Sequence, residues 1–122
     1  MSKRFHILFV DDNELNRILM QDMLEILFEN FTIQTYESAE EVLALDITSY
    51  DLILSDIDMP HINGFELYTL LRQEKNYTKP IIAVTALAIR GDKEKILMHG
   101  FDDYISKPID IDILESTIKK YI

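Results

Sequence analysis

The sequence predicts an α/β fold in which helices cover both faces of a parallel sheet. Two features of its 122 residues lead to this prediction. Short apolar runs, typical of strands buried on both faces, alternate five times with stretches whose apolar residues recur at helical spacing. Because crossovers between parallel strands are right-handed, helices on both faces make the fold doubly wound.

The first two units cover the first third of the chain. Residues 5–10 are almost continuously apolar, stop at two aspartates and predict a buried strand. An amphipathic helix is expected next, from the spacing of Leu15, Ile18, Leu19, Met23, Ile26 and Leu27. A second strand is expected at 32–36, and Ser38 with Glu41 has the spacing of a capping box for a helix that runs through Leu43.

The third unit begins with the apolar run 52–54, which leads to Asp56 and predicts the third strand. Pro60 and Gly64 mark the loop that follows. The third helix should then have an inner face formed by Phe65, Leu67, Leu70 and Leu71.

The last two units are shorter. Pro80 precedes a strand at 81–84, and a polar helix over 91–98 is expected to end at Gly100. The fifth strand is expected at 104–105. The final helix should begin near Asp110, with one face formed by Ile111, Leu114 and Ile118. Because the sequence has no linker, repeat or low-complexity stretch, we expect one compact domain over residues 1–122.

The composition excludes several classes of function. The absence of cysteine rules out disulfides, thiolate zinc sites and cysteine nucleophiles. Twelve Lys and Arg against 22 Asp and Glu give a net charge of -10, which argues against direct nucleic-acid binding. The first apolar run is too short for a signal-peptide core or a membrane span. We therefore expect a cytoplasmic protein with no membrane association.

Five polar residues follow the predicted strands: Asp11, Asp12, Asp56, Thr85 and Lys107. Taken singly, each has a simpler explanation as a helix cap or an exposed side chain. In a parallel sheet, however, the carboxyl ends of the strands meet at one edge. Three carboxylates crowded there repel one another unless a cation neutralises them, and oxygen ligands without His or Cys favour Mg2+.

Four stretches in the same order resemble the motifs of response-regulator receiver domains of two-component signalling, the CheY-like family. They are Val10 to Asn13, Asp51 to Pro60 with Gly64, Ala83 to Ala86, and Asp103 to Pro108. The resemblance covers nearly the whole chain. It implies a single receiver domain over 1–122, with a flavodoxin-like five-stranded sheet in the order 2-1-3-4-5.

The resemblance also implies a role for each residue at the sheet edge. Asp56 would accept a phosphoryl group, and Thr85 and Lys107 would hold its oxygens. The implied Mg2+ ligands are the carboxylates of Asp11, Asp12 and Asp56 and the backbone carbonyl of Asp58. Phosphoryl transfer depends mostly on alignment and charge neutralisation, so a weakly nucleophilic carboxylate suffices. The donor would be a phosphohistidine, so the chain would catalyse its own phosphorylation and dephosphorylation and turn over no separate small substrate.

Signalling would run from this site to protein partners. In the family, the hydroxyl at Thr85 and the aromatic at Tyr104 move towards the phosphoryl group and change the face formed by helix four, strand five and helix five. Tyr104 is equally well explained as an ordinary half-buried strand aromatic. The expected partners are a histidine kinase or histidine phosphotransfer protein upstream and a protein target downstream. An apolar Leu87 beside the site could hinder an attacking water, and residues 86–92 are similar to receivers of hybrid kinases and phosphorelay regulators.

Two alternatives remain open at this point. Asp56-Ile57-Asp58 also looks like the nucleophile motif of small phosphohydrolases of the haloacid dehalogenase type. That assignment would leave Asp11 and Asp12 without a role, and turnover of a generic phosphate ester would support it. The other alternative is a receiver that only binds a partner, which the complete set of site residues disfavours.

Overall fold

Strands and helices alternate along the chain in the computed structural model, which describes residues 4–86 and 92–122. The strands are β1 (Phe5–Val10), β2 (Phe31–Tyr36), β3 (Leu52–Asp56), β4 (Ile81–Thr85) and β5 (Asp103–Ser106). The helices are α1 (Glu14–Leu27), α2 (Ala39–Leu43), α3 (Gly64–Gln73), α4 (Asp92–His99) and α5 (Ile111–Lys119). The predicted alternation is therefore confirmed, with most element ends within one or two residues of the expected positions.

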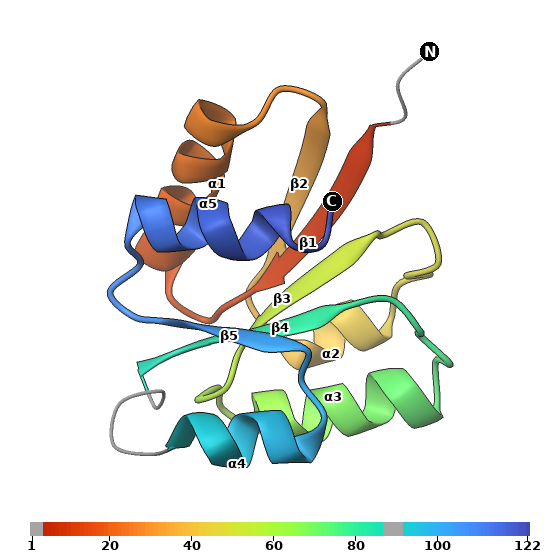
Figure 1. Cartoon of the computed structure of the whole chain (residues 1–122). Helices are drawn as coiled ribbons and strands as arrows, with labels where there is room; N and C mark the ends of the chain where they lie inside the picture. The colour runs from red at the N-terminus through yellow and green to blue at the C-terminus, as the bar shows by residue number, and fades with distance from the viewer. Residues whose placement is uncertain (1–3, 87–91) are drawn as a thin grey trace.

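The strands form one parallel sheet in the order β2-β1-β3-β4-β5, as the family resemblance implied. Figure 1 shows α1 and α5 on one face of this sheet and α2, α3 and α4 on the other. The register pairs Val10 with Ser55 and Thr85 with Ser106, so the carboxyl ends of these strands lie level. That alignment brings the residues directly after β1, β3 and β5 to one edge.

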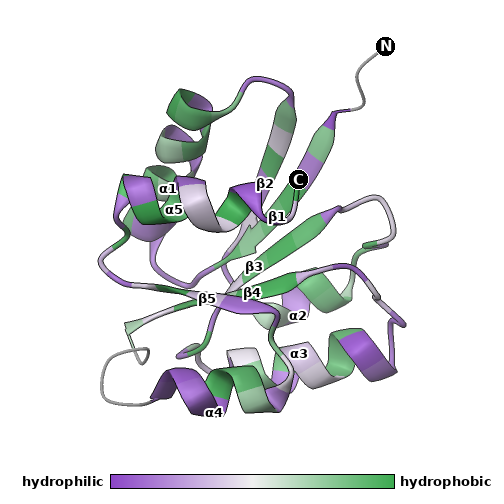
Figure 2. Ribbon diagram, viewed as in Figure 1, coloured by the Kyte–Doolittle hydropathy of each residue, from purple (hydrophilic) through white to green (hydrophobic). Residues whose placement is uncertain are grey.

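Each face of the sheet has its own hydrophobic core, and the alternation of side chains along β1 shows why. Ile7 and Phe9 pack in the core beneath α1 and α5, whereas Leu8 and Val10 pack in the core beneath α2, α3 and α4. All four are at most 1% exposed, and burial of each such side chain stabilises the fold by about 1.5–3 kcal/mol. Figure 2 shows the strongly hydrophobic β3 and β4 between the helical layers.

The helix α1 is present as predicted, but most of the apolar stripe that predicted it is not its buried face. The helix buries Met20 and Leu24, while most of the predicted stripe lies in solvent on the opposite side. The exposed members of that stripe are Leu15, Ile18, Leu19 and Ile26. Apolar residues occur on two faces of this helix, so periodicity alone does not select the buried one.

The capping box expected at α2 is only half formed. The Ser38 hydroxyl accepts the Glu41 amide at 3.2 Å, but the Glu41 carboxylate accepts the Glu37 amide, one residue too early for the reciprocal bond. A complete capping box begins α3 instead. There the Asn63 side chain accepts the Glu66 amide at 2.9 Å and the Glu66 carboxylate accepts the Asn63 amide at 3.1 Å.

The ends of the last two helices agree with the sequence analysis. Gly100 follows α4 with φ of 130°, a conformation that side chains rarely adopt, and its amide donates to the Leu97 carbonyl. Asp110 caps α5 by accepting two amides of the first turn. Gly91, where the fourth helix was expected to begin, lies outside the described residues.

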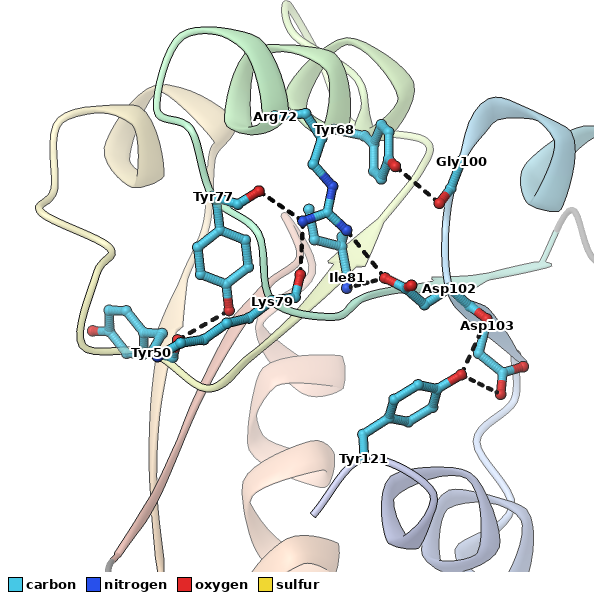
Figure 3. A network of polar contacts seen from close by, with 10 residues as sticks. All are labelled: Tyr50, Tyr68, Arg72, Tyr77, Lys79, Ile81, Gly100, Asp102, Asp103 and Tyr121. Atoms are coloured by element: carbon cyan, nitrogen blue, oxygen red, sulfur yellow. Dashed lines mark hydrogen bonds and ion pairs between the residues drawn. The ribbon is translucent and has the colours of Figure 1, made fainter.

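A polar network, which we call the Arg72 clamp, joins α3 to the amino ends of β4 and β5 (Figure 3). The guanidinium of Arg72 donates to the carbonyls of Tyr77 at 2.8 Å and Lys79 at 2.7 Å, and pairs with Asp102 at 3.1 Å. The same Asp102 carboxylate accepts the amide of Ile81, the first residue of β4. The clamp therefore fixes the end of the sheet opposite to the edge where the polar residues gather.

Candidate functional site

The carboxyl ends of β1, β3, β4 and β5 surround a cavity of about 240 Å³. All five residues predicted at the sheet edge line this cavity. Its walls are formed by Asp11, Asp12, Asn13, Asn16, Asp56, Asp58, Thr85, Ala86 and Lys107. The structure thus brings together residues that are up to 96 positions apart in the chain, from Asp11 to Lys107.

Three carboxylates meet in this cavity. Asp11, Asp12 and Asp56 each contribute an oxygen that lies within 4.8 Å of the other two. Asp11 is fully buried and Asp56 is 4% exposed, whereas Asp12 is open to solvent. Like charges at this separation are unfavourable in a partly desolvated site, so the cluster favours binding of a cation. A set of hard oxygen donors fits Mg2+.

Lys107 supplies an internal positive charge. Its ammonium nitrogen lies 2.8 Å from Asp11 Oδ2 and 3.1 Å from Asp56 Oδ1. Its backbone amide donates to the Thr85 carbonyl, which fixes the segment after β5 against β4. Burial lowers the pKa of Lys107, but the hydrogen bond to Asp11 and the charges of Asp56 and Asp11 outweigh it and leave that pKa above 10.5. Lys107 is therefore a cation throughout the neutral range.

The Asp56 carboxyl is destabilised in its charged form. Burial, and then the charge of Asp11, raise the pKa of Asp56 to about 6. Lys107 and the Ile57 amide, which donates to Asp56 Oδ1 at 2.9 Å, oppose this rise. Near neutral pH Asp56 is a carboxylate whose negative charge Lys107 does not fully compensate, which further favours a metal ion beside it.

Gly64 allows the loop that carries Asp56 to pack tightly on α3. Its amide donates to the Ile57 carbonyl at 2.8 Å. A Cβ at this position would lie 2.3 Å from the Asp56 carbonyl oxygen and 2.7 Å from Ile57 Cα. Both are backbone atoms, so any side chain would displace the phosphoacceptor candidate or the helix. From the sequence, Gly64 was expected in a loop and as part of a receiver-domain motif, but this packing role was not predicted.

The comparisons with known proteins agree with this geometry. Residues 7–119 match the family model described as the response regulator receiver domain. The chain belongs to the receiver-domain family. It is thus a signalling domain of two-component systems, which in general work with histidine kinases or phosphotransfer proteins, and not the dehalogenase-type hydrolase considered as the alternative.

Relatives of this receiver domain include the polar-differentiation response regulators DivK of Brucella ovis and Brucella suis. Each is 40% identical over 120 residues, which cover 95% of this chain and 94% of the relative. The receiver domain of sensor histidine kinase PA1611 from Pseudomonas aeruginosa PAO1 superposes with a TM-score of 0.82 at 30% identity over 97% of each chain. That structure holds a magnesium ion coordinated in the active site cleft. The chemotaxis protein CheY4 of Vibrio cholerae gives a TM-score of 0.84 at 25% identity over 98% of this chain and 99% of CheY4.

The first turn of α1 in this receiver domain is organised around Asp11. The Asn13 amide donates to Asp11 Oδ1 at 2.9 Å, the Asn16 side-chain amide to Oδ2 at 3.3 Å, and the Arg17 guanidinium to the Asp11 carbonyl at 2.7 Å. These contacts of Asn16 and Arg17 with Asp11 were not predicted from the sequence. The signal is that both residues lie one turn before Met20, on the face of α1 that is otherwise apolar and buried.

The two residues expected to switch the receiver domain occupy different environments. Thr85 ends β4 at the cavity and is 1% exposed. Tyr104 is half-buried in β5, pairs with Ala83 and packs against the core beneath α2, α3 and α4. Their switching roles stay predictions. Leu87, expected to hinder an attacking water, lies outside the described residues.

Among the residues that the structure describes, every helix is too short or too polar to cross a membrane. The cytoplasmic location expected from the sequence stays a prediction.

Proposed function

We propose that this receiver domain accepts a phosphoryl group on Asp56 from a phosphohistidine of a partner protein. The observation that carries the proposal is the position of Asp56 at the base of the cavity. It is almost fully buried, shares a carboxylate cluster with Asp11 and Asp12, and lies 3.1 Å from the Lys107 ammonium. We propose further that residues 1–122 form one receiver domain.

In the proposed transfer, an oxygen of Asp56 forms a bond to phosphorus while the bond between phosphorus and the donor imidazole nitrogen breaks. The electron pair of that bond stays on the donor nitrogen. The other ring nitrogen carries a proton taken up from solvent, so the imidazole leaves as the neutral ring. Lys107 stays protonated and supplies positive charge to the phosphoryl oxygens as it turns from Asp56 towards them. The Thr85 hydroxyl donates a hydrogen bond to the same group.

The metal proposed for this site is Mg2+, held by the carboxylates of Asp11, Asp12 and Asp56 and the backbone carbonyl of Asp58. When bound there, it would neutralise the carboxylate cluster and the charge on the phosphoryl oxygens. The donor chemistry of the cavity supports this choice because the proposed ligands are all oxygen atoms. Burial and the charge of Asp11, which raise the pKa of Asp56, also make a cation beside its carboxylate favourable. The exposed Asp58 side chain suits a role for its backbone rather than its carboxylate.

The surface beside the cavity supports a protein with an apolar contact surface as the phosphoryl donor. Asn13 and Asn16 line the cavity, and the same turns of α1 expose Leu15, Ile18 and Leu19 to solvent. Leu15 is 63% exposed, although it is a large apolar side chain. Exposed apolar patches of this kind mark protein contacts. A partner that covers this patch would bring a histidine on its own surface to the mouth of the cavity.

We propose that output runs to a downstream protein through the face formed by α4, β5 and α5. Tyr104 of β5 and the partly exposed Leu97 of α4 belong to these elements. An inward movement of Tyr104 after phosphorylation would change the shape of this face.

Intact mass spectrometry after incubation with acetyl phosphate and MgCl2 tests the proposal. The wild-type protein should gain one phosphoryl adduct, which EDTA should prevent. Asp56→Asn should gain none, and Asp58→Asn, a matched change of an exposed carboxylate in the same cavity, should still be labelled. Labelling of Asp56→Asn at the wild-type rate would place the phosphoacceptor elsewhere, and repeated turnover of a phosphate ester would favour a hydrolase.

A further inference from the structure

The Asp11 carboxylate has more hydrogen-bond donors than a site for a metal alone would need. Asn13 donates to Oδ1, whereas both Lys107 and Asn16 donate to Oδ2, at 2.8 and 3.3 Å. Asp11 is fully buried, so a lost donor is not replaced by bulk water. Two donors on one oxygen suggest that each is needed in a different state of the site.

We infer that Asn16 is a positioning residue, which keeps the Asp11 carboxylate aligned for the metal when Lys107 turns to the phosphoryl group. The inference rests on the proposed function, since it assumes that Asp11 is a metal ligand and that Lys107 moves. Once Lys107 leaves, the Asn13 amide still holds Oδ1 and the Asn16 amide still holds Oδ2. Bonds to both oxygens prevent rotation of the carboxylate about its side-chain torsion.

Asn16 can do this because its own position is fixed. Its backbone amide donates to the Asn13 side chain at 3.0 Å, as the first bond of the α1 cap. Arg17, the next residue, holds the Asp11 carbonyl at 2.7 Å. The turn of helix that carries Asn16 is thus tied to the backbone of Asp11 as well as to its side chain.

The chemistry of an amide suits this position better than a charged group. A lysine here would neutralise Asp11 and compete with the metal for its oxygens. An aspartate would present a second acceptor to the carboxylate and repel it. A neutral donor can orient Asp11 and leave its charge available to the cation.

The test measures Mg2+ binding to the full chain by calorimetry, alongside thermal melts in EDTA. In a Lys107→Ala background, where Asn16 is the side-chain donor left on Asp11 Oδ2, Asn16→Ala should weaken Mg2+ binding by roughly tenfold or more, as losses of residues that orient metal ligands generally do. Gln21→Ala in the same background is the matched control, because Gln21 is exposed on the same helix and its side-chain amide donates to Glu25. This control should bind Mg2+ as Lys107→Ala alone does.

Asn16→Asp keeps the size of the side chain and provides a second measurement. It should melt lower than Asn16→Ala in EDTA, since it places a negative charge against buried Asp11, and it should gain more from MgCl2. Equal melting of Asn16→Asp and Asn16→Ala in EDTA, or an Mg2+ affinity of Lys107→Ala that Asn16→Ala changes by less than twofold, would overturn the role of Asn16. A wild-type protein that failed to bind Mg2+ would instead count against the proposed metal site itself.

Discussion

The raised pKa of Asp56 makes a prediction about stability that can be worked out in sign and size. The pKa of Asp56 is about 6 in the folded protein, against 3.8 for an ordinary aspartate. Between these values the folded protein binds a proton that the unfolded chain has released. The contribution of Asp56 to stability therefore falls as pH rises from about 4 to 6 and stays low above that window.

The magnitude follows from the difference between the two pKa values, which corresponds to roughly 3 kcal/mol at pH 7. Asparagine is similar to the neutral carboxyl group, so Asp56→Asn should remove most of this penalty. We expect the variant to be more stable than wild type in EDTA at pH 7.5, by roughly 1–3 kcal/mol, and nearly equal to it at pH 4. MgCl2 should reduce or reverse the difference because the wild type binds the ion more tightly.

Urea unfolding at pH 4 and pH 7.5, in EDTA and in millimolar MgCl2, measures these differences. Asp58→Asn is the control, because it makes the same substitution at an exposed carboxylate of the same cavity and should change stability little. A gap of the same size at both pH values, or an Asp56→Asn protein less stable than wild type in EDTA at pH 7.5, would refute the reasoning. It would mean that burial and Asp11 do not penalise the Asp56 carboxylate.

Three further substitutions separate the roles described above. Lys107→Ala leaves buried Asp11 without its ion-pair partner, so it should lower the free energy of unfolding in EDTA by roughly 3 kcal/mol. MgCl2 should restore part of the loss, and unchanged stability in EDTA would contradict the ion pairing. Arg72→Ala removes the bonds to two carbonyls and Asp102, so it should lower the free energy of urea unfolding by roughly 2 kcal/mol. The stabilisation by MgCl2 should be unchanged, and its loss would show that the Arg72 clamp affects the metal site. Gly64→Ala should lower the free energy of unfolding by at least roughly 2 kcal/mol, since its Cβ would overlap the backbone of Asp56 and Ile57. It should also slow labelling by acetyl phosphate, and labelling at the wild-type rate would show that the loop adapts to the added side chain.

Most of the fold could be predicted because its signals are local. The apolar runs and their polar ends mark the strands, and a parallel sheet then brings residues such as Asp11, Asp56 and Lys107 to one edge whatever their distance in sequence. The strand order came from the resemblance to receiver domains, since periodicity does not order strands. The site residues followed from the same two sources.

What could not be predicted depends on contacts between elements. The buried face of α1 is one example, because the helix carries apolar residues on two faces and the sequence does not show which one is buried. The hydrogen bonds from Asn16 and Arg17 to Asp11 come from the buried face, which also carries Met20 and Leu24. The need for glycine at position 64 is another, because it comes from the backbone of β3 packed against the start of α3. Both features depend on which surfaces meet in the fold, and apolar periodicity alone does not specify this.

The Arg72 clamp has a consequence for how this domain can diversify. It fastens the amino ends of β4 and β5 to α3, while the cavity lies at the carboxyl ends of the strands. Anchoring at one end allows exposed loop residues at the other, unlike Gly64 and Lys107, to change in sequence with little cost to folding. Libraries that vary these exposed residues around the cavity while keeping Arg72 and Asp102 fixed should therefore yield a high share of folded proteins with altered partner preference.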